Sequence, residues 1–231
     1  MSIDKSLERR PRIGVYIEGR ADDEKQDQHL QNLMEALQSC VAACGEKYDI
    51  YVYSSKKRWK KYSKDYLLTY RPFPISGSSN ALGGMLIGKE ANCPKPPEWV
   101  GEMLNRKSDD FRLELMIFAT PTSLVKDYKL PNVVVLDDML ADEDSEHDAE
   151  WYKDLYHTAL KYADLAIVDP TEDVDQLIES LVADIENPAE IKRLSLGSDL
   201  EADPEVDLQE LKEGLSSILI HMLAKHDVRK A

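Results

Sequence analysis

The chain has 231 residues, 42% of them hydrophobic, and a formal net charge of −15 at pH 7. This hydrophobic content is too high for a disordered chain and is typical of a globular protein, and the length suits one large domain or one and a half small ones. The acidic balance excludes a general nucleic-acid-binding protein, because such a protein needs a basic surface to meet phosphates.

The ends and charge clusters of the chain bear on its location. No apolar run approaches the roughly 20 residues that span a bilayer, and the polar segment from Met1 to Arg12 lacks the apolar core of a signal peptide. We therefore expect a cytoplasmic protein. Residues 56–64 are rich in Lys and Arg with two aromatic side chains, so they could make a peripheral membrane contact; the alternative is a solvated helix face.

Cysteine and histidine positions give no sign of a metal centre. The three cysteines, Cys40, Cys44 and Cys93, have no zinc-ribbon spacing. Cys40 and Cys44 are four residues apart, so on a helix they share a face and fit as small core residues. No two of the five histidines form an HxxxH pair. We expect neither a metal nor a cofactor.

The first part of the chain predicts a strand, a helix and a strand. Residues 12–18, RIGVYIE, alternate as a strand does and end at Gly19. Acidic residues at 22–24 favour a helix start, and an apolar stripe then runs from Leu30 to Cys44 before Gly45. Residues 48–53 are a second strand, which completes a βαβ unit.

The middle of the chain is less regular. Residues 62–70 are amphipathic, and residues 71–99 carry five prolines and four glycines, which favours loop with one short buried helix in ALGGMLIGK. The patterns beyond predict a short helix at 99–104, a strand at 113–119, a short connection at 123–128 and a strand at 132–136.

The last third continues the alternation. We expect a helix at 149–162, a strand at 165–168, a helix at 172–184, a short strand within 190–200, an acidic linker at 197–207 and a helix at 207–225. Strands that alternate with helices predict an α/β fold, with a mostly parallel sheet and helices on both faces.

One strand of this sheet is followed directly by two acids. The run from Val133 to Leu136 has no polar face, which is typical of a strand covered on both sides. Asp137 and Asp138 come next in the chain, and ligands of parallel sheets bind at the carboxyl ends of the strands. The pair is therefore a candidate site.

Several segments, taken in order, resemble a known family. The order of RIGVYIEG, YDIYVYSSKKRWKKY, MIFATPTSL, PNVVVLDDML, EWYKDLYHTALKYADLAIVDP and IKRLSLGSDL is similar to the N-terminal half of GT-B glycosyltransferases, with most likeness to bacterial retaining enzymes that use nucleotide sugars. The resemblance covers about residues 12 to 200. It implies a Rossmann-like domain over residues 1–200, with a C-terminal helix at 201–231 packed on it.

Three departures from the family pattern matter. The Gly-Gly turn after the first strand is replaced by residues 20–23, RADD, and glycine is what lets a backbone approach a ligand closely. Asp137 and Asp138 stand where the family has the His and Asp of a His-Asp-Leu motif. After Gly197 about 34 residues remain, too few for the family's donor-binding domain.

The resemblance implies the acceptor-side domain of a nucleotide-sugar-dependent glycosyltransferase in glycan or polysaccharide synthesis. Its partners would be a donor-binding domain or subunit and a sugar acceptor. Asp137 could act as a general base, and carboxylates hold sugar hydroxyls by charge-assisted hydrogen bonds. The implied catalytic residues are Asp137 and Asp138, and the implied substrate-binding residues are Glu18, Gly19, Arg20 and Asp169.

Other interpretations remain open. Each of these acids could instead be a helix cap or a loop acid, and Asp169 before Pro170 favours that alternative. The whole chain could be a non-catalytic interaction protein on a degenerate glycosyltransferase scaffold, because fold does not fix function. Metal-assisted phosphotransfer fits less well, since its pattern is Asp-x-Asp and the two acids here are adjacent.

Overall fold

The computed structural model describes residues 10–17, 24–43, 48–54, 68–72, 98–136, 149–170, 172–196 and 204–230, and the structural statements below concern these residues. The elements in chain order are β1 (Arg12–Ile17), α1 (Glu24–Ala43), β2 (Asp49–Ser54), β3 (Leu68–Pro72), α3 (Glu98–Phe111), β4 (Leu115–Phe118), η2 (Ser123–Asp127), β5 (Asn132–Leu136), α4 (Ala149–Tyr162), β6 (Leu165–Val168), α5 (Glu172–Val182), β7 (Glu190–Arg193) and α6 (Pro204–Lys230).

The seven described strands form one sheet in the order β3-β2-β1-β4-β5-β6-β7. Every neighbouring pair is parallel. The chain therefore builds outward from β1 to β3, returns to place β4 on the other side of β1, and builds outward again to β7. Such a doubly wound sheet has a topological switch point between its two halves, here between β1 and β4. The predicted α/β fold with a parallel sheet is confirmed.

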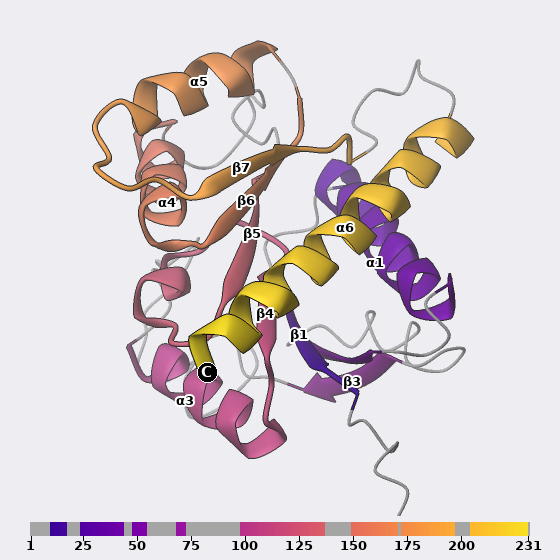
Figure 1. Cartoon of the computed structure of the whole chain (residues 1–231). Coiled ribbons are helices and arrows are strands. Elements are labelled where there is room, and N and C mark those ends of the chain that lie inside the picture. The colour runs from indigo at the N-terminus through magenta and orange to yellow at the C-terminus, as the bar shows by residue number, and fades with distance from the viewer. Residues whose placement is uncertain are drawn as a thin grey trace, which may run out of the picture.

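Helices cover both faces of the sheet. On one face, α1 and α6 pack on the odd-numbered residues of β4, β5 and β6, such as Ile117, Val133 and Ile167. On the other face, α3, η2, α4 and α5 pack on the even-numbered residues, such as Phe118 and Val134. Figure 1 shows α6 running across the sheet beside α1, with α3, α4 and α5 at the left of the view. We call these the α1/α6 face and the α4/α5 face.

The two-sided burial of β5 agrees with its sequence. All five of its residues are buried, with Val133 and Val135 in the core of the α1/α6 face. Val134 and Leu136 lie in the core of the other face. A strand that is covered on both sides needs no polar positions, which is why the run of valines has none.

The structure corrects four element boundaries. Leu68–Pro72 is a strand, β3, where the sequence showed only an amphipathic stretch running into a Pro-rich segment. Pro72 is tolerated because β3 is an edge strand, where a missing N–H leaves no neighbour unpaired. Helix α3 runs on to Phe111, the predicted connection at 123–128 contains the 3₁₀ helix η2, and α6 begins at Pro204, inside the predicted linker.

Helix α6 is held on the sheet by close contacts. Leu211, Leu215 and Leu219 are buried in the core of the α1/α6 face. The thiol of Cys40 donates a hydrogen bond to the carbonyl of Lys212, with 3.2 Å between sulfur and oxygen. Gly214 lies against Leu194, which follows β7, so closely that an added Cβ would overlap the leucine side chain. The C-terminal helix therefore shares the core of the sheet.

Candidate functional site

The predicted site residues follow strands that end at one edge of the sheet. Strands β1, β4, β5 and β6 are parallel neighbours, so their last residues, Ile17, Phe118, Leu136 and Val168, all lie at the carboxyl edge. In open α/β sheets, this edge beside the switch point is where ligands bind. Glu18, Gly19 and Arg20 come next after β1, and Asp137 and Asp138 come next after β5; all five lie outside the described residues, as does the basic segment 56–64.

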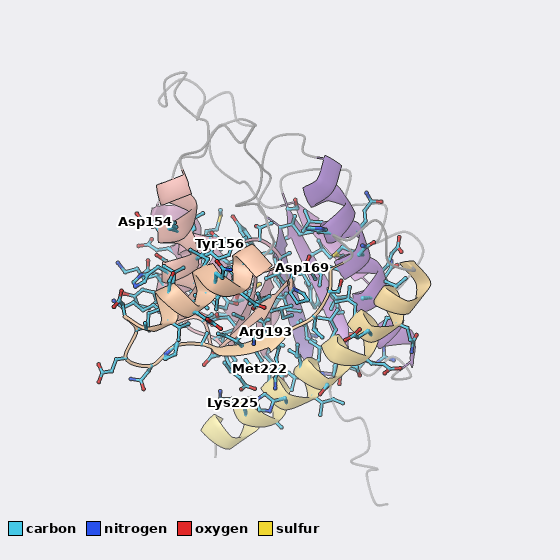
Figure 2. The ribbon with its side chains drawn as sticks, turned by 90° about the horizontal axis from the view of Figure 1, so that it is seen from above. Asp154, Tyr156, Asp169, Arg193, Met222 and Lys225 are labelled. Carbon is cyan, nitrogen blue, oxygen red and sulfur yellow. The ribbon has the colours of Figure 1, made fainter. Side chains whose placement is uncertain are left out.

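Asp169, directly after β6, is the one predicted site residue that the structure describes. Asp169 is 1% exposed, and Figure 2 shows it near the centre of the view. The backbone N–H of Leu196 donates to its Oδ1 at 3.4 Å, and its own N–H donates to the carbonyl of Leu136 at 3.3 Å. Asp169 thus ties the ends of β5 and β6 to the segment that follows β7, which is a structural contact.

The side chain of Asn32 holds the same segment from the other side. Its Nδ2 donates to the carbonyl of Leu196 at 2.8 Å. Leu196 is therefore bound through its N–H to the residue after β6 and through its C=O to α1. These two hydrogen bonds fix residue 196 at the carboxyl edge, on the α1/α6 face.

His29 lies one turn before Asn32 in α1, and sequence reasoning missed it. His29 is 4% exposed, and neither Nδ1 nor Nε2 has a hydrogen-bond partner among the residues that the structure describes. Buried polar groups are nearly always paired, and each unmet bond costs about 1–3 kcal/mol. One signal was available: His29 is four residues before Leu33, so it extends the apolar stripe of α1 inward.

A narrow pocket adjoins His29 at the carboxyl edge. Its walls come from three different parts of the chain and are otherwise apolar. The residues that line it are His29, Leu30, Leu33, Ala119, Val135 and Leu196. Ala119 directly follows β4, which is one of the two strands at the switch point. The next residue, Thr120, is fully buried, and its hydroxyl also has no hydrogen-bond partner in the described ranges.

The groups with an altered pKa, Tyr128 and Glu190, lie away from this edge. Burial raises the pKa of Tyr128, and the hydrogen bond with Ser108 offsets part of that rise. At the surface, the hydrogen bond from Lys192 holds the pKa of Glu190 below its usual range, with smaller help from His221. Glu190 opens β7 and so belongs to the opposite, amino edge of the sheet. Neither group is part of the candidate site.

Within the described ranges, no group of three or more His, Cys, Asp and Glu side chains is arranged to hold a metal ion. Among the helices described here, none is long and apolar enough to cross a bilayer.

The fold and the carboxyl-edge pocket define the class as a doubly wound, Rossmann-like α/β domain. No protein-family model matches the sequence, and no characterised protein sequence matches it. A sucrose-phosphate synthase from Thermosynechococcus elongatus matches the structure with a TM-score of 0.41 and 12% identity, over 90% of this chain and 99% of the other. An NAD(P)H:quinone oxidoreductase from Methanothermobacter marburgensis has a TM-score of 0.36 and 11% identity, over 90% and 99%. Similarity this distant carries no conclusion about activity.

Proposed function

We propose that this chain is the acceptor-side domain of a nucleotide-sugar-dependent glycosyltransferase of the GT-B type, acting in glycan or polysaccharide synthesis in the cytoplasm. It would work with a donor-binding domain, supplied by the same natural chain or by a partner. The observation that supports this most is the shared carboxyl edge of β1, β4, β5 and β6. The sequence segments that resemble the family supply these same strands.

The proposal gives chemical roles to the residues that follow these strands. Asp137 is the general base that removes a proton from the acceptor hydroxyl, and Asp138 holds a neighbouring hydroxyl by a charge-assisted hydrogen bond. Glu18, Gly19 and Arg20 contact the sugar from the β1 side. Asp169 contributes by fixing Leu196 through its hydrogen bond at the pocket wall.

The test is an add-back assay in extract of the source cells. The chain is removed by immunodepletion, and transfer of radiolabelled sugar is measured from a panel of UDP-, GDP- and ADP-sugars to endogenous acceptors. We expect depletion to lower transfer from one donor and the purified chain to restore it. The double variant Asp137→Asn and Asp138→Asn should fail to restore it, because both candidate carboxylates are removed.

The matched control is the double variant Asp109→Asn and Asp110→Asn. These residues are also adjacent aspartates, both exposed near the end of α3, before β4 begins, and so away from the carboxyl edge. This control should restore transfer as well as the wild type does. If both double variants restore transfer equally, Asp137 and Asp138 are not catalytic. If depletion changes no transfer reaction, the glycosyltransferase proposal is wrong.

One observation favours a second function, a non-catalytic interaction protein on the same scaffold. Asp169 is buried and hydrogen-bonded within the protein, so this acid serves the structure at a position where a sugar contact was predicted. Under this alternative, the chain binds its partner without contributing to chemistry. The add-back assay separates the two, because a scaffold restores transfer with either double variant.

A further inference from the structure

His29 is a buried polar side chain whose hydrogen-bonding capacity is unused. Its two ring nitrogens lack partners within the described part of the chain, and only 4% of the residue is exposed. Folding would favour an apolar residue at this helix position, since Leu30 and Leu33 beside it are buried in the core. A histidine with two unmet hydrogen bonds is therefore better explained by a ligand than by packing.

The pocket beside His29 lies where this class of fold binds ligands. Ala119 is the first residue after β4, Val135 is next to last in β5, and Leu196 follows β7. All three are on the α1/α6 face near the carboxyl edge. Together with α1, they enclose the imidazole next to the switch point between β1 and β4.

The chemistry of the pocket selects its ligand. A neutral imidazole offers one N–H donor and one nitrogen acceptor, and a hydroxyl group both donates and accepts. The other five lining residues are apolar, and burying a charged group among them costs far more than burying a hydroxyl. The net charge of −15 further disfavours an anionic ligand such as a sugar phosphate.

We propose that His29 binds a hydroxyl group of a neutral sugar in this pocket. The inference rests on the proposed function. It specifies that the acceptor of the proposed transferase is an uncharged, hydroxylated ligand. The pocket is closed in the free protein, so it must open before it can admit one hydroxyl group of the sugar. The side chains of Leu30 and Leu196 shift on binding, because His29 is enclosed in the free protein.

The experiment follows the imidazole itself. Protein labelled with ¹⁵N is titrated with D-glucose, D-galactose and D-mannose, and with the 6-phosphate of each, while ring ¹⁵N shifts and backbone amide shifts are recorded. We expect one or more neutral sugars to shift the His29 ring nitrogens in a saturable way, and each 6-phosphate to bind more weakly than its parent sugar.

Three variants accompany the titration. His29→Leu should lower affinity for the responding sugar about tenfold, which corresponds to two lost neutral hydrogen bonds. It should leave the thermal midpoint equal or higher, since it removes an unpaired polar group. His29→Gln, which also carries a donor and an acceptor, should restore part of the affinity. His157→Leu, a histidine of α4 on the opposite side of the sheet, is the control and should bind as the wild type does.

The outcomes separate this inference from the function it rests on. If a sugar shifts backbone amides at the carboxyl edge but leaves the His29 ring and the affinity of His29→Leu unchanged, the inference is wrong and the proposed function stands. If none of these sugars binds, the inference is wrong, and the add-back assay decides the proposed function separately. If His29→Leu lowers the thermal midpoint, the imidazole has a structural partner and the inference loses its basis.

Discussion

Two glycines differ in the space that a methyl group would find. A Cβ on Gly14 in β1 would lie 2.7 Å from Met116 Cε and 2.8 Å from Leu113 Cδ1, whereas a Cβ on Gly101 in α3 has Leu124 Cδ2 at 3.8 Å as its nearest neighbour. We expect Gly14→Ala to lower the free energy of unfolding by about 1–3 kcal/mol, because the core must move. Gly101→Ala should raise it by about 0.5–1 kcal/mol, because alanine favours the helix. Urea unfolding measures both, and effects of the same sign would contradict the geometry.

Glu190 gives a pH-dependent prediction at the same scale. Its Oε1 lies 3.2 Å from Lys192 Nζ and its Oε2 lies 3.2 Å from His221 Nε2. Because these partners lower the pKa of Glu190 in the folded protein from 4.5, the stabilisation is complete above pH 4.5 and is lost as the pH falls through the folded pKa. The effect is small, since all three groups are well exposed.

The measurement compares thermal midpoints of the wild type and Glu190→Gln between pH 7 and pH 3.5. We expect the variant to be slightly less stable at pH 7 and the difference to shrink below pH 4.5. Glu179→Gln, an exposed glutamate of α5, controls for the loss of one surface charge. A Glu190→Gln difference that grows as the pH falls would contradict the assigned contacts.

At the scale of elements, α6 supplies part of the core. Leu215 is fully buried between α6 and the sheet, and Ile220 on the same helix is 57% exposed. Leu215→Ala should lower the free energy of unfolding by about 2–5 kcal/mol, because it leaves a cavity in the core. Ile220→Ala should change it by less than about 0.5 kcal/mol. Denaturant unfolding measures both, and a neutral Leu215→Ala would mean that α6 is not packed on the sheet in solution.

At the scale of the whole molecule, the proposed function predicts what the isolated chain cannot do. Donor binding is assigned to another domain, so the 231-residue chain should have no measurable affinity for nucleotide sugars. Calorimetric titration with a panel of UDP- and GDP-sugars is the measurement. Binding at micromolar strength would show that the donor site lies within this chain.

Much of the fold could be predicted because its signals are local. Valine runs such as 132–136 require cover on both sides, and the stripe of α1 repeats at the helical period. The edge strand β3 was missed because a strand with one neighbour tolerates a proline such as Pro72 and shows little of the apolar alternation by which strands are recognised. The end of α3 was missed because its sequence is polar, and only the tertiary fold buries Ser108, which bonds Leu104 and Tyr128.

The candidate site, like the fold, could be predicted only where its signals are local in the sequence. By itself, the sequence determined that acidic residues follow buried parallel strands, because a strand and the loop after it are adjacent in the sequence. Only the tertiary structure decided that Asp169 is buried against Leu196, and that His29 meets Ala119 and Val135 from distant parts of the chain. The physical reason is that periodicity reports which face of an element is apolar, whereas the order of the strands decides which residues meet there.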